Sequence, residues 1–157
     1  VYCPNGKSVD HPDFSLKLEW FQSLAKYLDN PSSPLDRNNL VIGGDFNICP
    51  SALDTWDEES HKGSIFHTDL EREKIELLKS LGLTDLFRFK YPEKQLFSWW
   101  DYRGGPFYKN QGLRIDLLLG SPALRERVTH VYTDRDFRKK RADLTPSDHA
   151  PVIAELD

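Results

Sequence analysis

The residues Asp45, Phe46 and Asn47 follow a short apolar run, Leu40 to Ile42, and a pair of glycines. The apolar run predicts a buried strand, and an Asp is rarely buried unless it is paired or bound to a cation. Asp and Asn after Gly are also ordinary turn residues, so this stretch alone favours a surface turn. Polar groups after other strands would favour a site instead, because sites of α/β proteins gather at strand ends.

A second carboxylate, Asp116, stands inside the apolar run GLRIDLLLGS at residues 112–121. Between Ile115 and Leu117, a charged Asp needs a partner or access to a cleft. An ion pair with Arg114 is the structural alternative, but adjacent strand residues point to opposite faces, which places Arg114 poorly for that pair. The local pattern leaves a site role and a structural role for Asp116 both open.

The segment TPSDHAPV at residues 145–152 carries the third group of polar residues. Pro146 and Pro151 stiffen the loop around Asp148 and His149, just before the last predicted strand. A lone His is usually unremarkable. A His beside an Asp in a rigid loop, with another Asp elsewhere in the chain to orient it, indicates an acid–base group.

The candidate residues all carry oxygen or nitrogen groups close to strand-like runs. They are Tyr2, Asp45, Asn47, Asp116, Asp148 and His149. Carboxylates with an amide and no cysteine suit a hard cation, Mg²⁺ or Mn²⁺. The sequence has no GxSxG motif and no P-loop. The chemistry that fits is metal-assisted attack of water on a phosphodiester, with a carboxylate directing the water.

The composition sets bounds on the class of protein. The 157 residues predict one domain, and the net charge of −4 does not indicate a basic nucleic-acid binder, although it does not exclude one. Cys3 and Cys49 show no metal-ligand spacing and predict a reducing, cytoplasmic location. We expect no membrane span and no signal peptide. The chain lacks Met and opens on the strand-like VYCP, which predicts that the natural start is missing.

Hydrophobic spacing predicts the elements that must position these residues. Residues 12–30 and 68–82 have helical spacing, and Thr68 with Glu71 forms a capping box before a stop at Gly82. Residues 30–39 read as a loop. The strand candidates are residues 1–3, 39–43, 96–99, 113–119, 128–132 and 151–155. Together these elements predict an α/β or α+β domain in which helices cover a sheet.

Five motifs occur in an order that resembles a known family. They are VYCPNG, GGDFN, FSWWDYR, NQGLRIDLLL and PSDHAPV. They resemble the exonuclease III and apurinic/apyrimidinic endonuclease family of the endonuclease/exonuclease/phosphatase superfamily over nearly the whole chain. The resemblance implies a four-layer αββα sandwich. Residues 1–157 would form its C-terminal part, one half to two-thirds of the sandwich, with helices on one face of the sheet.

The resemblance also implies roles for the residues. Asp45 would deprotonate or orient the attacking water beside the metal, and Asn47 would help to hold the water and the phosphate. Tyr2 would contact the scissile phosphate. His149 would donate a hydrogen bond to a phosphate oxygen, with Asp116 fixing its tautomer.

Further positions would serve the metal and the DNA. Asp148 would lie beside the metal. Trp99, Leu113 and Ile115 would wall a pocket for an extruded abasic sugar. The residues expected to contact the DNA backbone are Asn110 and Arg114, together with the basic run Arg138, Lys139, Lys140 and Arg141 if that run is not simply a solvated loop.

The resemblance therefore implies a metal-dependent DNA-repair nuclease that acts on double-stranded DNA at 3′ ends or abasic sites. Family members carry an earlier half with a metal-binding Glu, which has no counterpart here. We therefore expect an inactive fragment that self-associates, as a homodimer, through an exposed sheet. Two alternatives stay open: a phosphatase or phosphodiesterase of the same superfamily, and a non-catalytic module that binds DNA or itself.

Overall fold

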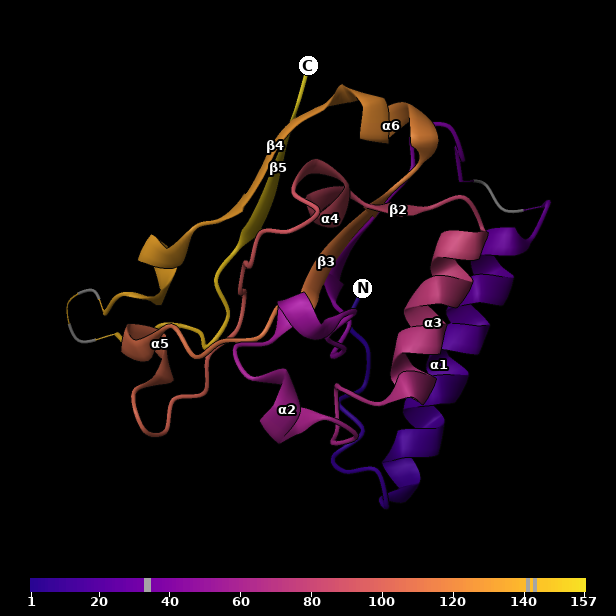
Figure 1. Cartoon of the computed structure of the whole chain (residues 1–157). Coiled ribbons are helices and arrows are strands. Elements are labelled where there is room, and N and C mark those ends of the chain that lie inside the picture. Colours follow the sequence, from indigo (N-terminus) through magenta and orange to yellow (C-terminus); the bar gives the residue numbers. More distant parts are fainter. Residues whose placement is uncertain (33–34, 141, 143) are drawn as a thin grey trace.

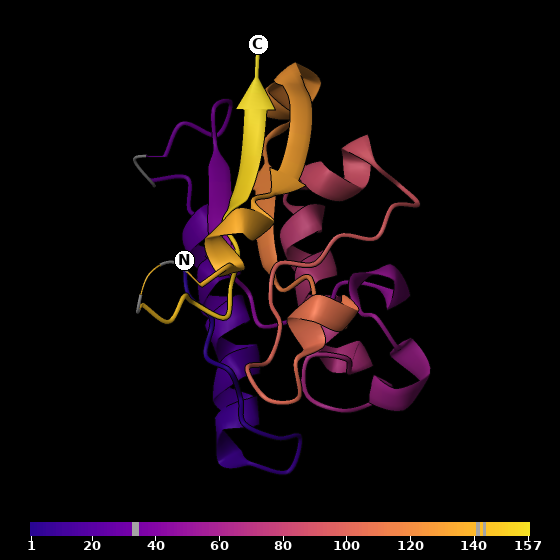
Figure 2. The same cartoon turned by 90° about the vertical axis from the view of Figure 1, so that its left-hand side faces the viewer.

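The computed structural model describes residues 1–32, 35–140, 142 and 144–157. Its described strands form two antiparallel sheets. In the first sheet the order is β1 (Val41–Asp45), β3 (Asp116–Gly120) and β2 (Thr84–Asp85). In the second, β4 (Val128–Thr133) pairs with β5 (Val152–Leu156). Figure 2 shows β4 and β5 side by side, and Figure 1 shows them on the side of β3 that faces away from the long helices.

Two long helices, α1 (Pro12–Asp29) and α3 (Asp69–Ser80), lie side by side and cover one face of the first sheet (Figure 1). Their buried side chains meet β1 and β3 in one core. That core includes Phe21, Leu28, Ile42, Phe46, Ile75, Leu78, Leu117 and Leu119. Apolar side chains that repeat along one helix face need a partner surface, and the alternate residues of β1 and β3 supply it.

Shorter elements connect these layers. They are η1 (Ala52–Asp54), α2 (Glu58–His61), α4 (Leu86–Lys90), α5 (Pro106–Lys109), α6 (Pro122–Arg127) and η2 (Arg135–Arg138). No helix among the described residues is long and apolar enough to cross a membrane.

The predicted mixed fold of helices and sheet is confirmed, as are both long helices and the capping box of Thr68 and Glu71. On α3, Leu70 is half exposed, whereas Ile75 and Leu78 lie in the core. Residues 1–3 and 96–99 form isolated bridges rather than strands. Of the predicted loop 30–39, residues 33–34 lie outside the described part of the chain, and the rest contains no helix or strand.

The structure explains why two glycines, Gly43 and Gly44, precede Asp45. A Cβ at Gly44 would lie 1.8 Å from the carbonyl oxygen of Val1, and one at Gly43 would lie 2.7 Å from the Leu118 side chain. Gly44 also has a φ of +150°, which disfavours other residues. The glycines let the first residues of the chain pass close to β1, which brings Tyr2 next to Asp45.

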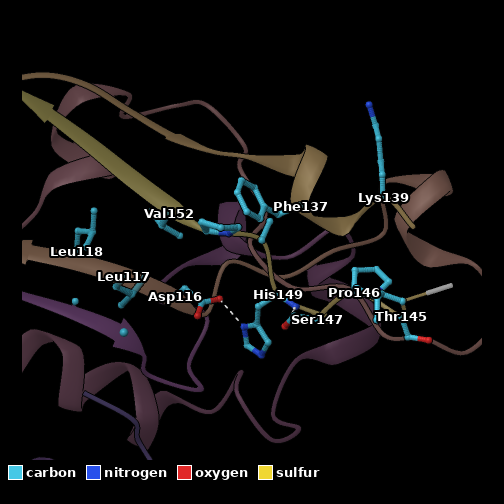
Figure 3. Close-up of a pocket in the computed structure, with 15 residues that line it drawn as sticks. Asp116, Leu117, Leu118, Phe137, Lys139, Thr145, Pro146, Ser147, His149 and Val152 are labelled. Carbon is cyan, nitrogen blue, oxygen red and sulfur yellow. Dashed lines mark hydrogen bonds and ion pairs between the residues drawn. The ribbon is translucent and has the colours of Figure 1, made fainter. Parts of the chain in front are cut away.

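On the other face of the first sheet, Leu118 packs against α4 and β4, and beside them this face forms one wall of a pocket of about 820 Å³ (Figure 1). Gly43, Leu118 and Val152 line the pocket at the strands, and Leu144 and Pro146 line it at the loop before β5 (Figure 3). Most of the lining is apolar, but Asp116 and His149 contribute polar groups to it. The pocket therefore includes two of the polar residues that the sequence singles out.

Candidate active site

The carboxylate of Asp45 is fixed by Asn47 at the end of β1. The backbone N–H of Asn47 donates to Asp45 Oδ1 at 2.8 Å, and its side-chain amide donates to Asp45 Oδ2 at 3.0 Å. The same amide donates to the Cys3 carbonyl at 2.8 Å. Asn47 has a φ of +50°, a left-handed conformation that Asn tolerates better than most residues. The turn at the strand end is therefore real, and it also orients a carboxylate.

The second pair, Asp116 and His149, lies directly beside the first. Asp116 begins β3, and its backbone is in register with Asp45 on the antiparallel neighbour β1. His149 Nδ1 is 2.8 Å from Asp116 Oδ2, which fixes the ring so that Nε2 faces the other carboxylate. His149 Nε2 lies 4.0 Å from Asp45 Oδ2. Figure 3 shows His149 and Asp116 pointing toward one another, between the strand residues Leu117 and Val152 and the loop residue Pro146.

Burial and charge shift the ionisation of this group. Burial raises the pKa of the Asp45 carboxyl to about 6, against a hydrogen bond from the Asn47 N–H that acts to lower it. For His149, burial acts to lower the pKa, but the hydrogen bond and the charge of Asp116 outweigh it and raise the pKa. A carboxylate whose pKa lies near neutrality beside a His that tends to stay protonated suits a base and a hydrogen-bond donor.

A buried serine holds the loop around Trp99 against β3 and the His149 loop. Ser98 Oγ accepts from the N–H groups of Ile115 and Asp116, at 3.2 and 3.1 Å. The Ser98 carbonyl accepts from the Ala150 N–H at 2.7 Å. Ser98 therefore holds both segments of the Asp116–His149 pair, through its hydroxyl on the Asp116 side and through its carbonyl next to His149.

Trp99 and Asp148 meet at the same place. The indole Nε1 of Trp99 donates to Asp148 Oδ2 at 2.9 Å. Trp99 forms backbone bridges with both Leu113 and His149. Leu113 and Ile115 are buried with Cys49 behind Trp99. They support the indole and offer a ligand almost no surface in this structure, so their role as pocket walls stays a prediction, whereas Trp99 is only half-buried.

Tyr2 and Asn110 lie on the surface. The backbone of Tyr2 bridges to Asp45, and its side chain is 67% exposed, so the phenol is free to meet a ligand beside the carboxylate. Asn110 ends α5 in a left-handed conformation, and its side-chain oxygen accepts a hydrogen bond from Arg135. The structure neither joins Asn110 to the cluster of Asp45 and His149 nor contradicts its expected contact with DNA.

The position of Arg114 differs from the one expected from the sequence, which was at the DNA backbone. It is 1% exposed, and its guanidinium bonds Asp54 and Asp85, with distances of 2.7 Å to Asp54 Oδ1 and 2.7 Å to Asp85 Oδ2. The prediction that Arg114 contacts the DNA backbone is therefore wrong for this structure, because no part of the guanidinium reaches the surface. Arg114 pairs with Asp54 and Asp85 and not with Asp116, as the alternation of strand residues predicts.

The basic run is also only partly a surface feature. Arg138 is buried and donates to the carbonyls of Ser147 and Trp100, at 2.8 and 3.1 Å. Lys139 and Lys140 are exposed. Arg141 lies outside the described residues.

Two residues that contact the candidate site, Asn5 and Ser98, were not identified from the sequence. Asn5 donates from its amide toward Asn47 Oδ1 at 3.5 Å, and Ser98 makes the contacts described above. Asn5 stands in a Pro-Asn-Gly segment that reads as a turn, and Ser98 in an apolar run. Neither pattern has a periodicity or a partner spacing that distinguishes a site residue from a structural one.

The residues that could hold a metal supply part of a ligand set. Asp45 and Asp148 offer carboxylate oxygens, but Asn47 bonds both oxygens of Asp45, and Trp99 bonds one oxygen of Asp148. Within the described part of the chain, no group of three or more His, Cys, Asp or Glu side chains is placed to hold a metal ion. The donors have the right chemistry for a hard cation, and the set is incomplete in this part of the chain.

The class of protein to which the chain belongs is defined by two features together, the two-sheet α/β fold and the cluster of Asp45, Asn47, Asp116 and His149. Residues 4–149 match the model of the Endonuclease/Exonuclease/phosphatase family, so the chain belongs to that family. Nucleases of this family generally depend on a divalent metal.

The individual relatives are nucleases that act on DNA. The chain is 38% identical to exodeoxyribonuclease III from Haemophilus influenzae, over 99% of this chain and 59% of the relative. It is 29% identical to an exodeoxyribonuclease from Bacillus subtilis, over 97% of this chain and 56% of that relative. The chain therefore spans less than two-thirds of the length of these relatives.

Solved structures agree with this relationship. The 3′ phosphatase NExo from Neisseria, bound to a product DNA hairpin, superposes with a TM-score of 0.92 at 39% identity, over 100% of this chain and 59% of that chain. An AP endonuclease from Archaeoglobus fulgidus superposes with a TM-score of 0.91 at 29% identity, over 100% and 60%. The resemblance drawn from the motifs is thereby confirmed at the level of the family and its exodeoxyribonuclease III and AP endonuclease relatives.

Proposed function

We propose that this chain is the C-terminal part of a metal-dependent DNA-repair nuclease, which hydrolyses phosphodiesters as a 3′–5′ exonuclease and as an endonuclease at abasic sites. One observation carries the proposal. The Asp45 carboxylate, held at both oxygens by Asn47, faces the Nε2 of a His149 ring that Asp116 orients. The relatives by sequence and structure support DNA as the substrate.

In this proposal, water lies between Asp45 and the phosphorus. Asp45 takes a proton from that water, and its raised pKa of about 6 makes it a stronger base than an exposed Asp while leaving it ionised above neutrality. The water oxygen bonds to phosphorus as the bond from phosphorus to the 3′ oxygen breaks, and the leaving 3′ oxygen takes a proton from solvent water. His149, kept protonated by Asp116, donates from Nε2 to a phosphoryl oxygen as negative charge builds there. The exposed phenol of Tyr2 contacts the same phosphate from the first residues of the chain.

The metal in the proposal is Mg²⁺ or Mn²⁺, which would offset the negative charge of the phosphoryl oxygens when bound. Asp45 and Asp148 would contribute oxygen ligands, and residues outside this chain would contribute the rest. The share of the relatives that the chain leaves unmatched is in keeping with a ligand set completed elsewhere.

DNA would lie against the cluster of Asp45, Asp116 and His149. Trp99, half-buried beside Asp148, would bound a slot for an extruded abasic sugar, which costs less to unstack than an intact nucleotide. Lys139 and Lys140 are exposed and would contact phosphates without reading sequence. Both cysteines are free and buried, which supports a reducing, cytoplasmic location.

The test is a nuclease assay on a reconstituted nuclease, meaning this chain joined to the part of the Haemophilus influenzae enzyme that it leaves unmatched. We expect cleavage of an abasic duplex and removal of a 3′ phosphate from DNA with Mg²⁺ or Mn²⁺, and loss of both activities with a chelator. An inositol phosphate serves as the comparison substrate. Hydrolysis of the inositol phosphate without cleavage of DNA would favour the phosphatase alternative. Binding of DNA without any hydrolysis would favour a non-catalytic module.

A further inference from the structure

A lysine occupies a core position on the apolar face of α1. Lys17 is 0% exposed and lies one helical turn from Phe14 and Phe21, which are both buried. Its ammonium makes three hydrogen bonds, which is the number that it can donate. It donates to the carbonyl of Asn47 at 2.5 Å, to the carbonyl of Asn5 at 3.2 Å, and to Glu71 Oε1 at 2.5 Å.

The partner, Glu71, is equally buried and equally well bonded. Its Oε1 accepts from Lys17 and from the Phe66 N–H at 3.0 Å. Its Oε2 accepts from the N–H and the hydroxyl of Thr68, at 3.1 and 2.8 Å, as part of the capping box of α3. The pair therefore joins α1 and α3 to the two loops that contain Asn5 and Asn47, with every charged oxygen and N–H used.

Stability alone is a weak reason for this pair. Two charges lose their hydration on burial, and an apolar pair of similar volume is often as stable or more stable. The cost shows in the pKa of Lys17, which burial lowers although Glu71 acts to raise it. A Met at position 17 would fill the same space in the core between the two helices. A Met could therefore replace the packing of Lys17, but it could not replace the three hydrogen bonds of the ammonium.

The ammonium touches the backbone of the residue that holds the candidate base. Lys17 bonds the carbonyl of Asn47, whose N–H and side-chain amide bond the two oxygens of Asp45. Asn47 is in the left-handed region at φ +50°, so its backbone gains from an anchor on the carbonyl side. A continuous series of hydrogen bonds thus runs from Glu71 on α3 through Lys17 and Asn47 to Asp45.

We propose that Lys17 and Glu71 are positioning residues, which hold the Asn47 turn, and through it the Asp45 carboxylate, in the geometry that hydrolysis requires. This inference rests on the proposed function for its catalytic consequence, but its structural part concerns this chain alone. Neither residue touches the substrate, and both act through Asn47.

The structural part is tested on the chain itself with Lys17→Met/Glu71→Gln, which removes both charges and leaves an acceptor for the capping box. The readout is the side-chain amide signal of Asn47 in a ¹⁵N-labelled sample. In the parent, the two bonds to Cys3 and Asp45 should give a well-separated pair of protons that exchange slowly. In the double variant, we expect the chemical-shift difference between these two protons to become small. We expect their exchange with solvent to become at least about tenfold faster, with an unchanged far-UV circular dichroism spectrum. The matched control Lys79→Met/Glu76→Gln removes an ion pair of the same type from the surface of α3 and should change nothing.

A double variant that keeps the parent's Asn47 signals would overturn the proposal. If Met at position 17 prevents folding, Lys17→Gln/Glu71→Gln keeps a polar but shorter side chain there, and the same two results decide.

The catalytic part is tested in the reconstituted nuclease. The double variant should lower kcat about 10- to 100-fold with KM changed less than threefold, because a misplaced base slows the chemical step and leaves DNA contacts intact. An active parent whose variant keeps its kcat would overturn the inference. An inactive parent would count against the proposed function instead, and the Asn47 signals would still decide the structural part.

Discussion

At the scale of single residues, the site consists of small sets of hydrogen bonds that fix one group at a time. Asn47 fixes Asp45, Asp116 fixes His149, and Asp148 bonds Trp99. This arrangement makes the effect of a substitution at one residue specific enough to test.

Trp99 separates substrate recognition from chemistry. Trp99→Ala removes the half-buried indole and its bond to Asp148, and should reduce cleavage at abasic sites at least about tenfold, on the order of a lost base-stacking contact. Removal of a 3′ phosphate needs no extruded sugar and should fall much less. The measurement is kcat/KM on both substrates, with Trp56→Ala as a control for an exposed indole outside the cluster. Equal losses on both substrates would mean that Trp99 serves as core packing.

His67 predicts a pH dependence of stability. It is 2% exposed, its Nε2 has no hydrogen-bond partner among the described residues, and burial lowers its pKa. Because the unfolded chain takes up this proton first, the contribution of neutral His67 is complete above about pH 6.5 and is lost as the pH falls toward the folded-state pKa. Titrations of Asp45 and His149 act in the opposite direction, so the comparison must be with a variant rather than with the parent at one pH.

Urea unfolding of the parent and of His67→Gln at pH 7.5 and pH 5 measures this effect. We expect the advantage of the parent over the variant to shrink at pH 5, since only the parent carries the buried imidazole. If the parent exceeds His67→Gln in free energy of unfolding by the same amount at both pH values, the titration of His67 does not contribute to the pH dependence of stability.

At the scale of elements, buried ion pairs fix the short segments that the long helices do not reach. Arg114 joins η1 and the start of α4 through Asp54 and Asp85, and Arg88 adds a second cation on Asp54. Arg114→Met would leave two buried carboxylates with too few partners. We expect a loss of about 3–5 kcal/mol in the free energy of unfolding, measured with urea. Lys79→Met, which breaks an exposed pair, should cost about 1 kcal/mol or less. A small loss for Arg114→Met, together with weaker DNA binding, would instead return Arg114 to the DNA interface.

The elements also show how far the sequence alone could lead. Both long helices and most residues of β1, β3, β4 and β5 were predictable, because apolar spacing and the capping box are local signals. The short β2 and α4 were not, because they depend on contacts with β3 and β4 rather than on their own sequence. Periodicity places position 17 on the core face of α1, but its partner lies 54 residues away.

The residues of the candidate site can also be separated into those that the sequence predicts and those that it does not. Asp45, Asn47, Asp116 and His149 were predictable because each polar residue interrupts or follows an apolar run and matches a family motif. Arg114 matched a motif as well, yet its partners lie 60 and 29 residues away, at Asp54 and Asp85. The sequence could not show that these carboxylates would surround it, and a buried Arg and a DNA-binding Arg look the same in a motif.

At the scale of the whole molecule, the apolar pocket on the face of the first sheet opposite α1 and α3 predicts association. The pocket of about 820 Å³ is largely apolar, and Leu144 at its rim is 75% exposed. Apolar surfaces of this kind are uncommon on isolated monomers. We therefore expect this chain to form a two-fold homodimer through that face, and to form a one-to-one complex once the unmatched part of a relative is supplied.

Light scattering checks this prediction. Leu144→Glu should weaken the dimer at least about tenfold, on the scale of one buried Leu side chain, while leaving the helical content unchanged. A parent chain that stays monomeric at high concentration would show that the face needs no partner.

The most direct test of the whole account is the turnover number of the reconstituted nuclease on an abasic duplex, with Asp45→Asn and with His149→Ala. Each variant removes one member of the facing pair and should lower kcat roughly 100-fold or more with nearly unchanged DNA binding, because both groups act on the transition state. Asp29→Asn, at an exposed Asp on α1, should leave kcat unchanged. A loss of less than about threefold for both variants, with folding intact, would contradict the assignment of Asp45 and His149 to catalysis.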